Sequence, residues 1–406
     1  MKRDDDKDAA LHAGLPVFFR LTCRIAERLR YGAIRFILPD GRNLVFSGAE
    51  ETQSQGVVIV RDFAFARRSI LGGDIGFFES YADGQWDSPN VADVLYVFAR
   101  NADYVKDAFA KTPLIALFER LRNNFVNRNT RAGSRRNIMA HYDLGNAFYE
   151  KWLDRTMTYS SARFGEGARN LAAAQTNKYR TLARSIDLRQ GEKVLEIGSG
   201  WGGFAEFAAK ECGASVTGLT ISPAQLDYAR ARIQREGLGE RVEFKLLDYR
   251  DASGAFDKVA SIEMFEAVGR EYWPAYFAKV RELLKPGGAA GIQTITIADR
   301  FFDRYSRSSD FIKRFVFPGG MLPSESALRN EVRKAGLVWQ GAAAFGQDYA
   351  ATLAEWRRRF LAAWDDIVAM GFDDKFKKLW QFYLSYCEAG FRAATTDVMQ
   401  IRLART

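Results

Sequence analysis

The chain has 406 residues, of which 47% are hydrophobic and 27% are charged, a composition that excludes a largely disordered protein. No apolar run reaches the roughly 18 residues that a membrane-spanning helix needs, and the stretch MKRDDDKDAA at the N-terminus lacks the apolar core of a signal peptide. The net charge of +9 is compatible with an anionic membrane surface, with nucleic acid, or with a solvated surface that binds neither. Two histidines and three widely separated cysteines offer little for a zinc site or a Ser-His-Asp triad, and the cysteines fit a reducing cytosol.

Residues 1–125 are expected to form a small N-terminal α+β domain. Residues 33–38, 44–46 and 57–61 read as strands. Gly72-Gly73 reads as a turn, and a helix is expected to begin after Ser88-Pro89. No catalytic cluster of side chains is visible in this part of the sequence.

A basic segment, expected to be a mobile linker, covers residues 126–140. Nucleic-acid binding would need stacking aromatic side chains, which are scarce here. Contact with anionic lipid headgroups is therefore the favoured active role for this segment.

Residues 141–406 are expected to form one catalytic domain of the α/β class. Helical stretches alternate with strands predicted at residues 193–197, 215–219, 242–246, 258–262 and 289–295. This alternation implies a mostly parallel sheet with helices on both faces, and such a sheet binds ligands at the carboxyl ends of its strands. The candidate ligand-binding segments at those ends are 198–203, 220–225, 248–249, 263–266 and 293–296. The C-terminal quarter of the chain is predicted to be largely helical.

A glycine-rich turn follows the first of these strands, in the sequence VLEIGSGWGG at residues 194–203. Gly198, Gly200 and Gly203 have the spacing G-x-G-x-x-G, which aims backbone N–H groups at a nucleotide-like ligand. A nicotinamide site would place an acid at the end of the second strand, but that strand ends in Thr220-Ile221-Ser222. Because Glu196 precedes the glycines instead, the pattern favours S-adenosylmethionine (SAM) over NAD; a glycine-rich turn without a ligand is the alternative.

Residues 301–324 mix Phe and Tyr with Arg and Lys and then reach Pro318-Gly319-Gly320. A helical lid that is apolar inside and basic at its rim would suit a long-chain lipid with an anionic headgroup. A plain surface excursion is the alternative.

Six segments in order resemble the cyclopropane-fatty-acyl-phospholipid synthases and the related mycolic-acid and fatty-acid C-methyltransferases. They are HYDLGNAFYEKWLDRTMTYSSARF (141–164), VLEIGSGWGG (194–203), VTGLTISPAQ (216–225), MFEAVG (264–269), FPGGMLPS (317–324) and FGQDYAATLAEW (345–356). The resemblance is strong over residues 140–392 and loose in the N-terminal domain. It implies a Rossmann-like methyltransferase sheet, and transfer of a methyl group from SAM to the cis double bond of an acyl chain.

The resemblance and the strand ends together give an expected SAM site. Its residues are Tyr159, Ser160, Glu196, Gly198, Gly200, Gly203, Thr220, Ile221, Gln225, Asp248 and Tyr249. Gln225 is expected to hold the ribose, the role for which the second strand offers no carboxylate.

The resemblance also implies a catalytic base, since methyl transfer to an alkene leaves a carbocation that must lose a proton. In the family this base is thought to be bicarbonate, held by a Cys backbone amide, a Glu, a His, an Ile backbone group and a Tyr. Glu266, Ile295 and Tyr349 match that set, whereas Ser161 stands for the Cys and Gln293 for the His. An amide donates a hydrogen bond but carries no proton. Cys387 matches a family cysteine sometimes proposed as a nucleophile, although a buried thiol is more often inert.

These observations predict a cytoplasmic enzyme, peripheral to the inner membrane face, that acts on unsaturated acyl chains of membrane phospholipids. The expected product is a methyl-branched or a cyclopropane acyl chain. The alternatives are a catalytically lapsed SAM- or lipid-binding protein and an RNA methyltransferase. Nucleic acid is not an expected partner. The sequence leaves the oligomeric state open, a homodimer included.

Overall fold

The computed structural model of the chain describes residues 14–50, 54–104, 144–165 and 167–406. These residues divide into two compact units, one made of the described residues up to 104 with residues 373–393, the other of residues 144–372 and 394–406. The basic segment expected at 126–140 lies outside the described residues.

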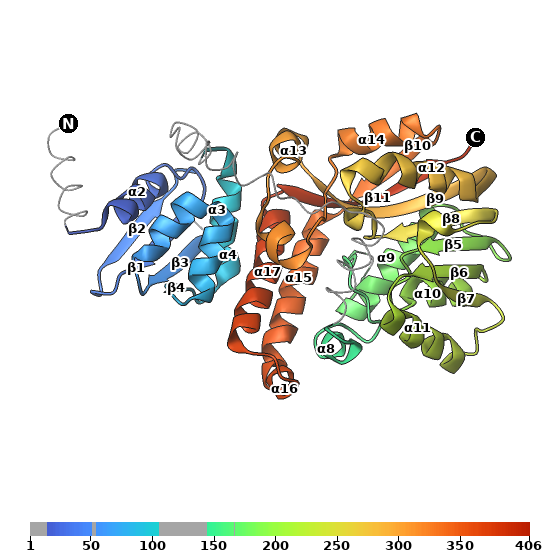
Figure 1. Ribbon diagram of the computed structural model, residues 1–406, viewed down its shortest axis with the longest axis horizontal. Helices are drawn as coiled ribbons and strands as arrows, with labels where there is room; N and C mark the ends of the chain where they lie inside the picture. Colours follow the sequence, from blue (N-terminus) through green and yellow to red (C-terminus); the bar gives the residue numbers. More distant parts are fainter. Residues whose placement is uncertain (1–13, 51–53, 105–143, 166) are drawn as a thin grey trace. The chain divides into compact units, whose positions relative to one another are not determined.

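The first unit contains a four-stranded sheet in the order β2-β1-β3-β4, in which β1 is antiparallel to β2 and parallel to β3 (Figure 1). Its strands are β1 (Ala33–Ile37), β2 (Asn43–Ser47), β3 (Gln55–Val60) and β4 (Trp86–Asp87). Its helices are α2 (Val17–Ala26), α3 (Ala64–Ala82), α4 (Val91–Arg100) and α17 (Asp374–Arg392). Helix α4 lies close to β3 because Gly56 has no side chain: a Cβ there would be 2.8 Å from the Cα of Val94. The turn predicted at Gly72-Gly73 is instead a kink within α3, where Gly73 has a φ of 61°.

Helix α17 is far along the chain but belongs to the first unit, where it contacts α3 and α4. Arg392 forms an ion pair with Asp93 at 2.9 Å, and Lys378 donates to the carbonyl of Tyr81 at 2.9 Å. The sequence placed this helix in the domain 141–406, because a helical repeat of apolar residues identifies a buried face but not its partner.

The second unit contains a seven-stranded sheet in the order β10-β11-β9-β8-β5-β6-β7. Its strands are β5 (Lys193–Ile197), β6 (Ser215–Thr220), β7 (Val242–Leu246), β8 (Phe256–Ile262), β9 (Leu284–Ile297), β10 (Val338–Ala344) and β11 (Thr396–Ala404). The strands β5 to β9 are parallel, and β10 and β11 form an antiparallel edge. The expected α/β sheet is therefore confirmed, but the last two strands were not predicted.

Helices cover both faces of this sheet. The longer helices are α9 (Leu171–Ser185), α10 (Gly203–Glu211), α11 (Pro223–Arg235), α12 (Trp273–Leu283), α14 (Glu325–Lys334) and α15 (Gly346–Ala362). The shorter ones are α8 (Asn146–Glu150), η2 (Tyr249–Asp251), η3 (Phe265–Ala267), η4 (Arg270–Tyr272), α13 (Asp299–Tyr305), η5 (Ile312–Val316) and α16 (Trp364–Ala369).

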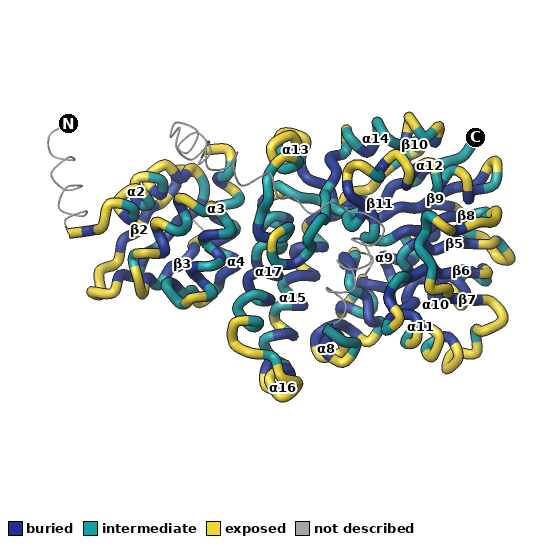
Figure 2. Tube along the Cα trace, viewed as in Figure 1, coloured by how far each residue is buried: buried dark blue, intermediate teal, exposed yellow. Residues whose placement is uncertain are grey.

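Two hydrophobic clusters on opposite faces hold the helices to the sheet. Val194 of β5 packs with residues of α9, α10 and α11, whereas the next residue, Leu195, packs with residues of α12 and α14. Successive side chains of a strand point to opposite faces, so β5 contributes to both clusters. The central strands are mostly buried, and the outer helix surfaces and the edge strands β7 and β10 are more exposed (Figure 2).

Candidate active site

The glycine turn joins β5 to α10. Gly198 and Gly200 have φ values of 82° and 52°, a conformation that side-chain residues rarely adopt. A Cβ at Gly198 would lie 2.7 Å from Cγ of Met264, and one at Gly203 would collide with the hydroxyl of Tyr179. The turn therefore needs glycine and presents the N-terminus of α10 at the carboxyl end of the sheet.

Glu196 lies in β5 just before this turn and is buried. Burial raises the pKa of its carboxyl group to about 8, mainly by removing water from the charged form. Its Oε2 atom is buried and has no hydrogen-bond partner among the described residues. An unsatisfied buried oxygen beside a glycine turn fits a ligand that brings a donor or a positive charge.

The end of β6 is held by hydrogen bonds between neighbouring side chains. The Thr220 hydroxyl donates to Oε1 of Gln225 at 2.9 Å, and the backbone N–H of Gln225 donates to the Ser222 hydroxyl at 3.3 Å. Thr220 and Gln225 are buried, and Ile221 between them is partly exposed. The expected ribose-binding amide is thus fixed at the carboxyl end of the sheet.

Asp248 and Tyr249 follow β7, but Asp248 is already paired. Both of its carboxylate oxygens accept from the Arg250 guanidinium, at 2.9 and 2.5 Å. Burial raises the pKa of Tyr249 to about 12, and its ring centroid lies 5.4 Å from that of Tyr276.

Aromatic side chains from two parts of the second unit pack together as an aromatic wall. The Tyr159 ring lies 5.3 Å from that of Trp356 and 5.5 Å from that of Trp152, and Tyr349 lies 6.1 Å from Trp356. Trp152 and Trp356 are fully buried. The wall brings segments before β5 together with α15, which follows β10.

Three of the groups expected to hold an anion converge on the carboxyl group of Glu263. They belong to Ser161, Gln293 and Tyr349. Oε1 of Glu263 accepts from the backbone N–H of Ser161 at 2.8 Å and from Nε2 of Gln293 at 2.7 Å. Its Oε2 accepts from the Tyr349 hydroxyl at 2.6 Å. Burial raises the pKa of Glu263, against the lowering effect of the Tyr349, Ser161 and Gln293 hydrogen bonds and of the nearby Lys178 ammonium. The sequence placed Glu263 at a strand end but gave it no role.

Gln293 is oriented by a second amide on the neighbouring strand. Nε2 of Gln400 donates to Oε1 of Gln293 at 3.0 Å and also to the carbonyl of Lys178 at 3.0 Å. Gln293 and Gln400 are paired across β9 and β11 and both are buried. The Gln293 oxygen is thereby occupied, and its NH₂ group points at Glu263.

Glu266 lies in η3 and faces β9. Its Oε1 accepts from the backbone N–H of Ile295 and from the Thr294 hydroxyl, the latter at 3.1 Å. Its Oε2 is buried without a hydrogen-bond partner among the residues described. Burial, and then the charge of Glu263, raise the pKa of Glu266 to about 8. The structure thus brings together Glu266, Ile295, Gln293, Tyr349 and Ser161.

Lys178 of α9 is a buried cation that sequence reasoning missed. Its Nζ donates to the Ser160 hydroxyl at 2.6 Å and lies 4.4 Å from the Tyr179 ring centroid. Burial lowers the pKa of Lys178 to about 7, although Glu263, Asp154 and Glu196 attract its charge. The signal for it was a lysine on the apolar face of a predicted helix.

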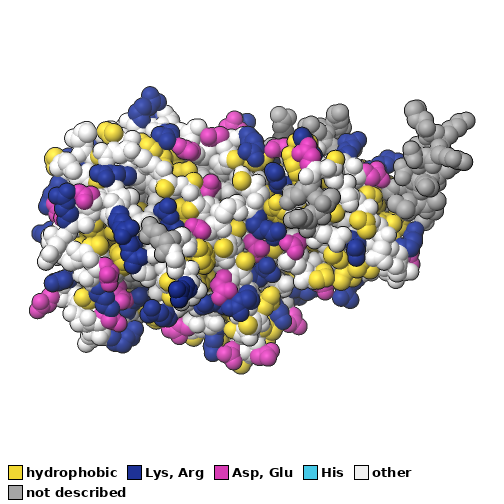
Figure 3. All heavy atoms as spheres, turned by 180° about the vertical axis from the view of Figure 1, so that it is seen from behind, with side chains coloured by type: hydrophobic (Ala, Val, Ile, Leu, Met, Phe, Trp, Pro, Cys, Tyr) yellow, Lys and Arg dark blue, Asp and Glu magenta, His cyan; other side chains and the backbone are white. Residues whose placement is uncertain are grey.

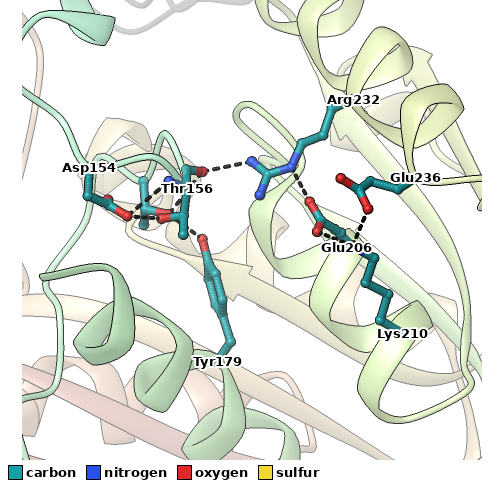
Figure 4. Close-up of polar contacts among 8 residues, drawn as sticks. Asp154, Thr156, Tyr179, Glu206, Lys210, Arg232 and Glu236 are labelled. Carbon is teal, nitrogen blue, oxygen red and sulfur yellow. Dashed lines mark hydrogen bonds and ion pairs between the residues drawn. The ribbon is translucent and has the colours of Figure 1, made fainter. Parts of the chain in front are cut away.

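A polar network fixes the loop that carries Ser160 and Ser161 (Figure 4). The Thr156 backbone N–H and hydroxyl donate to Asp154 at 2.9 and 2.7 Å, and Arg232 of α11 donates to the Thr156 carbonyl at 2.7 Å. Arg232 also pairs with Glu206 of α10. The loop is therefore tied to the two helices that follow the glycine turn and the Thr220 segment.

The lid segment expected at 301–324 returns to the acid cluster. The backbone N–H of Met321 donates to the carbonyl of Glu266 at 2.9 Å. Lys313 lies 3.6 Å from the Tyr305 ring centroid and donates to the Tyr305 carbonyl at 2.8 Å. The segment is therefore packed by its own residues and bonded to η3.

Cys387 lies on α17, in the first unit. It is partly exposed. The structure does not group it with the acid cluster of the second unit.

Comparison with known proteins gives one consistent result. The sequence model of the family "Mycolic acid cyclopropane synthetase" matches residues 129–401. The tuberculostearic acid methyltransferase UfaA1 of Mycobacterium tuberculosis is 39% identical over 396 residues, which cover 95% of this chain and 90% of that protein. The cyclopropane-fatty-acyl-phospholipid synthase of Escherichia coli K12 is 35% identical over 364 residues, 85% of this chain and 87% of the other.

A solved structure shows the same fold. The mycolic acid cyclopropane synthase CmaA1, in complex with SAH and CTAB, superposes with a TM-score of 0.63 and 27% identity. The match covers 66% of this chain and 98% of the CmaA1 chain.

Proposed function

This chain belongs to the mycolic acid cyclopropane synthetase family and is a SAM-dependent methyltransferase, and from that premise we propose that it methylates the cis double bond of unsaturated phospholipid acyl chains. The observation that carries the proposal is the buried acid cluster of Glu263 and Glu266. It lies at the carboxyl ends of β8 and β9, beside an aromatic wall.

The residues at the strand ends fit SAM. When bound, SAM supplies an electrophilic methyl group. Glu196 offers a buried oxygen without a partner, which suits the positively charged amino-acid end, and Gln225 offers an amide for the ribose. The glycine turn lets the ligand approach the backbone, and we expect the aromatic ring of Tyr159 to contact the same ligand.

The aromatic wall and the acid cluster suit chemistry on an alkene. A carbon–carbon double bond is a weak nucleophile, so the site must exclude water and other nucleophiles that would intercept the cation. Aromatic faces stabilise a cation without reacting with it, and Tyr159, Tyr349 and Trp356 provide such faces. A carboxylate beside them then accepts the proton that is released.

The lid supports a lipid substrate. Residues 301–324 mix apolar and basic side chains, with Phe311 and Val316 buried and Arg304 and Arg314 exposed. Among the residues described, no helix has the length and hydropathy to cross a bilayer. Figure 3 shows Lys and Arg side chains over one face, interspersed with Asp and Glu and with apolar side chains. The exposed arginines of the lid and the net charge of +9 support our further proposal of peripheral contact with the cytoplasmic side of the inner membrane.

The test is incubation of the purified protein with SAM and liposomes that contain cis-unsaturated phospholipid. We expect acyl chains to gain the mass of one CH₂ group while S-adenosylhomocysteine forms. Saturated liposomes are the control. SAM binding without S-adenosylhomocysteine formation would instead support the lapsed binding protein, and no change with any unsaturated lipid would contradict the proposal.

The carbon that loses the proton determines the product. Loss from the new methyl group closes a cyclopropane ring, whereas loss from a neighbouring chain carbon gives a methyl-branched alkene. Both gain the same mass, so NMR of the isolated acyl chains is needed to separate them.

A further inference from the structure

We propose that Glu263 supplies the catalytic base from within the chain, so that this enzyme needs no bicarbonate. The inference rests on the proposed function and identifies the group that receives the proton.

The hydrogen-bond donors of the expected bicarbonate site are already used. The backbone N–H of Ser161 and the hydroxyl of Tyr349 each have one hydrogen, and each donates it to Glu263. The Gln293 amide donates to the same carboxylate, while its oxygen is held by Gln400. Bicarbonate does not fit this arrangement, because it would compete with a carboxylate that is covalently part of the chain.

The backbone at Glu263 has a strained conformation that other interactions must stabilise. Glu263 has a φ of 48°, in the left-handed region that favours glycine, and holding another residue there costs of order 1–3 kcal/mol. Its backbone N–H donates to the Gln293 carbonyl at 2.8 Å, which keeps this conformation while its side chain reaches the three donors. A glycine would adopt the same backbone without strain but would leave those donors unpaired.

The two carboxyl groups differ in the protonation state that their surroundings favour. Glu263 accepts three hydrogen bonds and lies near the Lys178 ammonium, which favours its ionised form. Glu266 accepts two, and the Glu263 charge opposes its ionisation. The hydrogen bonds to Glu263 and the effect of its charge on Glu266 therefore favour an ionised Glu263, which acts as the base, beside a protonated Glu266.

The proposed reaction has two parts, methyl transfer and loss of a proton. The π electron pair of the alkene forms the bond between one alkene carbon and the methyl group, while the S–CH₃ bond breaks and leaves its electron pair on sulfur as S-adenosylhomocysteine forms. The other alkene carbon is left as a carbocation. The electron pair of a neighbouring C–H bond then forms the ring bond or the new double bond, and the proton passes to a Glu263 oxygen. The positive charge of the sulfonium thus leaves as a proton, which the carboxylic acid later releases to solvent.

The experiment compares wild type with Glu263→Gln and Glu263→Gly on cis-unsaturated liposomes, in buffer freed of CO₂ and in buffer with added bicarbonate. Wild-type turnover should be the same in both buffers. Glu263→Gln should lose about 10²–10⁴-fold in turnover in both. Glu263→Gly should lose as much without CO₂ and regain part of its activity with bicarbonate or formate, because its backbone is unstrained and its donors are free.

Asp187→Gly is the matched control, because Asp187 also has a positive φ of 50° but is exposed and remote in sequence from the acid cluster. Its turnover should equal that of wild type in both buffers. SAM affinity, measured by calorimetry, should stay within about threefold in all variants, as removal of the base does not touch the glycine turn.

Two results would overturn the inference while leaving the proposed function intact: wild-type turnover that collapses without CO₂, or Glu263→Gln that keeps wild-type turnover. Absence of wild-type turnover on every unsaturated lipid would instead overturn the proposed function, and this inference with it.

Discussion

Glu196 and Glu263 lie at the carboxyl ends of two paired parallel strands, β5 and β8, but their carboxyl groups differ in their hydrogen-bond partners. Oε2 of Glu196 is buried without a partner among the described residues, whereas Glu263 accepts hydrogen bonds from three separate segments. An unsatisfied buried oxygen is destabilising unless a ligand completes it. The Glu196 region is therefore built to receive a molecule, whereas the Glu263 carboxyl group has its hydrogen bonds from the chain itself.

After Glu263→Gln, the largest effect is expected in the same acid cluster, from Glu266→Gln. The variant keeps a hydrogen-bond acceptor for Ile295 but replaces the carboxyl group beside the base Glu263 with an amide that cannot exchange a proton, so turnover should fall about 10²–10³-fold. SAM affinity should change little. Steady-state kinetics and calorimetry together test this, and unchanged turnover would place the acid cluster outside the chemistry.

Glu196→Gln tests the region built for a ligand. Loss of the negative charge should weaken SAM binding about 10- to 100-fold, the range for hydrogen bonds to charged groups, while turnover at saturating SAM falls less. Glu211→Gln, an exposed glutamate at the end of α10, is the control and should bind SAM as wild type does. Equal affinity in the two variants would contradict the assignment of Glu196.

The dependence of stability on pH gives a third, smaller test. Burial raises the pKa of Glu266 from its usual 4.5 to about 8, so between these values the folded protein binds a proton that the unfolded chain has lost. This group therefore lowers the free energy of unfolding as pH rises from about 5 to 8. The Tm of wild type relative to Glu266→Gln should fall across that window. A constant difference between the two would mean that Glu266 is ionised in the fold.

The smallest effect is expected at Cys387, because the proposed chemistry needs no covalent enzyme intermediate. Cys387→Ser should keep turnover and SAM affinity within about twofold, as expected for a substitution that removes no group from the reaction. Loss of turnover with an unchanged Tm would require a direct role for the thiol.

The sequence predicted the parallel part of the sheet well, because each strand is a short apolar run with turn residues at its ends. The predicted bounds of β5 and β7 are those of the structure. The strands β10 and β11 were missed for a physical reason. Alanine and glycine in β10 have low strand propensity, and β10 exists because it pairs with β11, which pairs with β9.

The candidate site was only partly predictable. Glu266, Tyr349 and Gln293 were found through motifs, each of which is local in sequence. The role of Glu263 depends on its backbone conformation and on donors from residues 161, 293 and 349, which no local pattern displays. Lys178 was missed because burial of a lysine against Ser160 and an aromatic ring depends on tertiary packing.

The assignment of α17 to the first unit has a practical consequence for anyone who dissects the protein. The chain leaves the second unit after residue 372, contributes a helix to the first, and returns at 394 to supply β11, whose Gln400 orients Gln293. A fragment cut to begin near residue 141 would carry that helix without its partners, with Phe382 no longer packed against Phe77, Phe78 and Tyr81, and should be prone to aggregate. A truncation before residue 394 would remove the strand that sets the acid cluster, so severing either end disables the reaction centre in the middle.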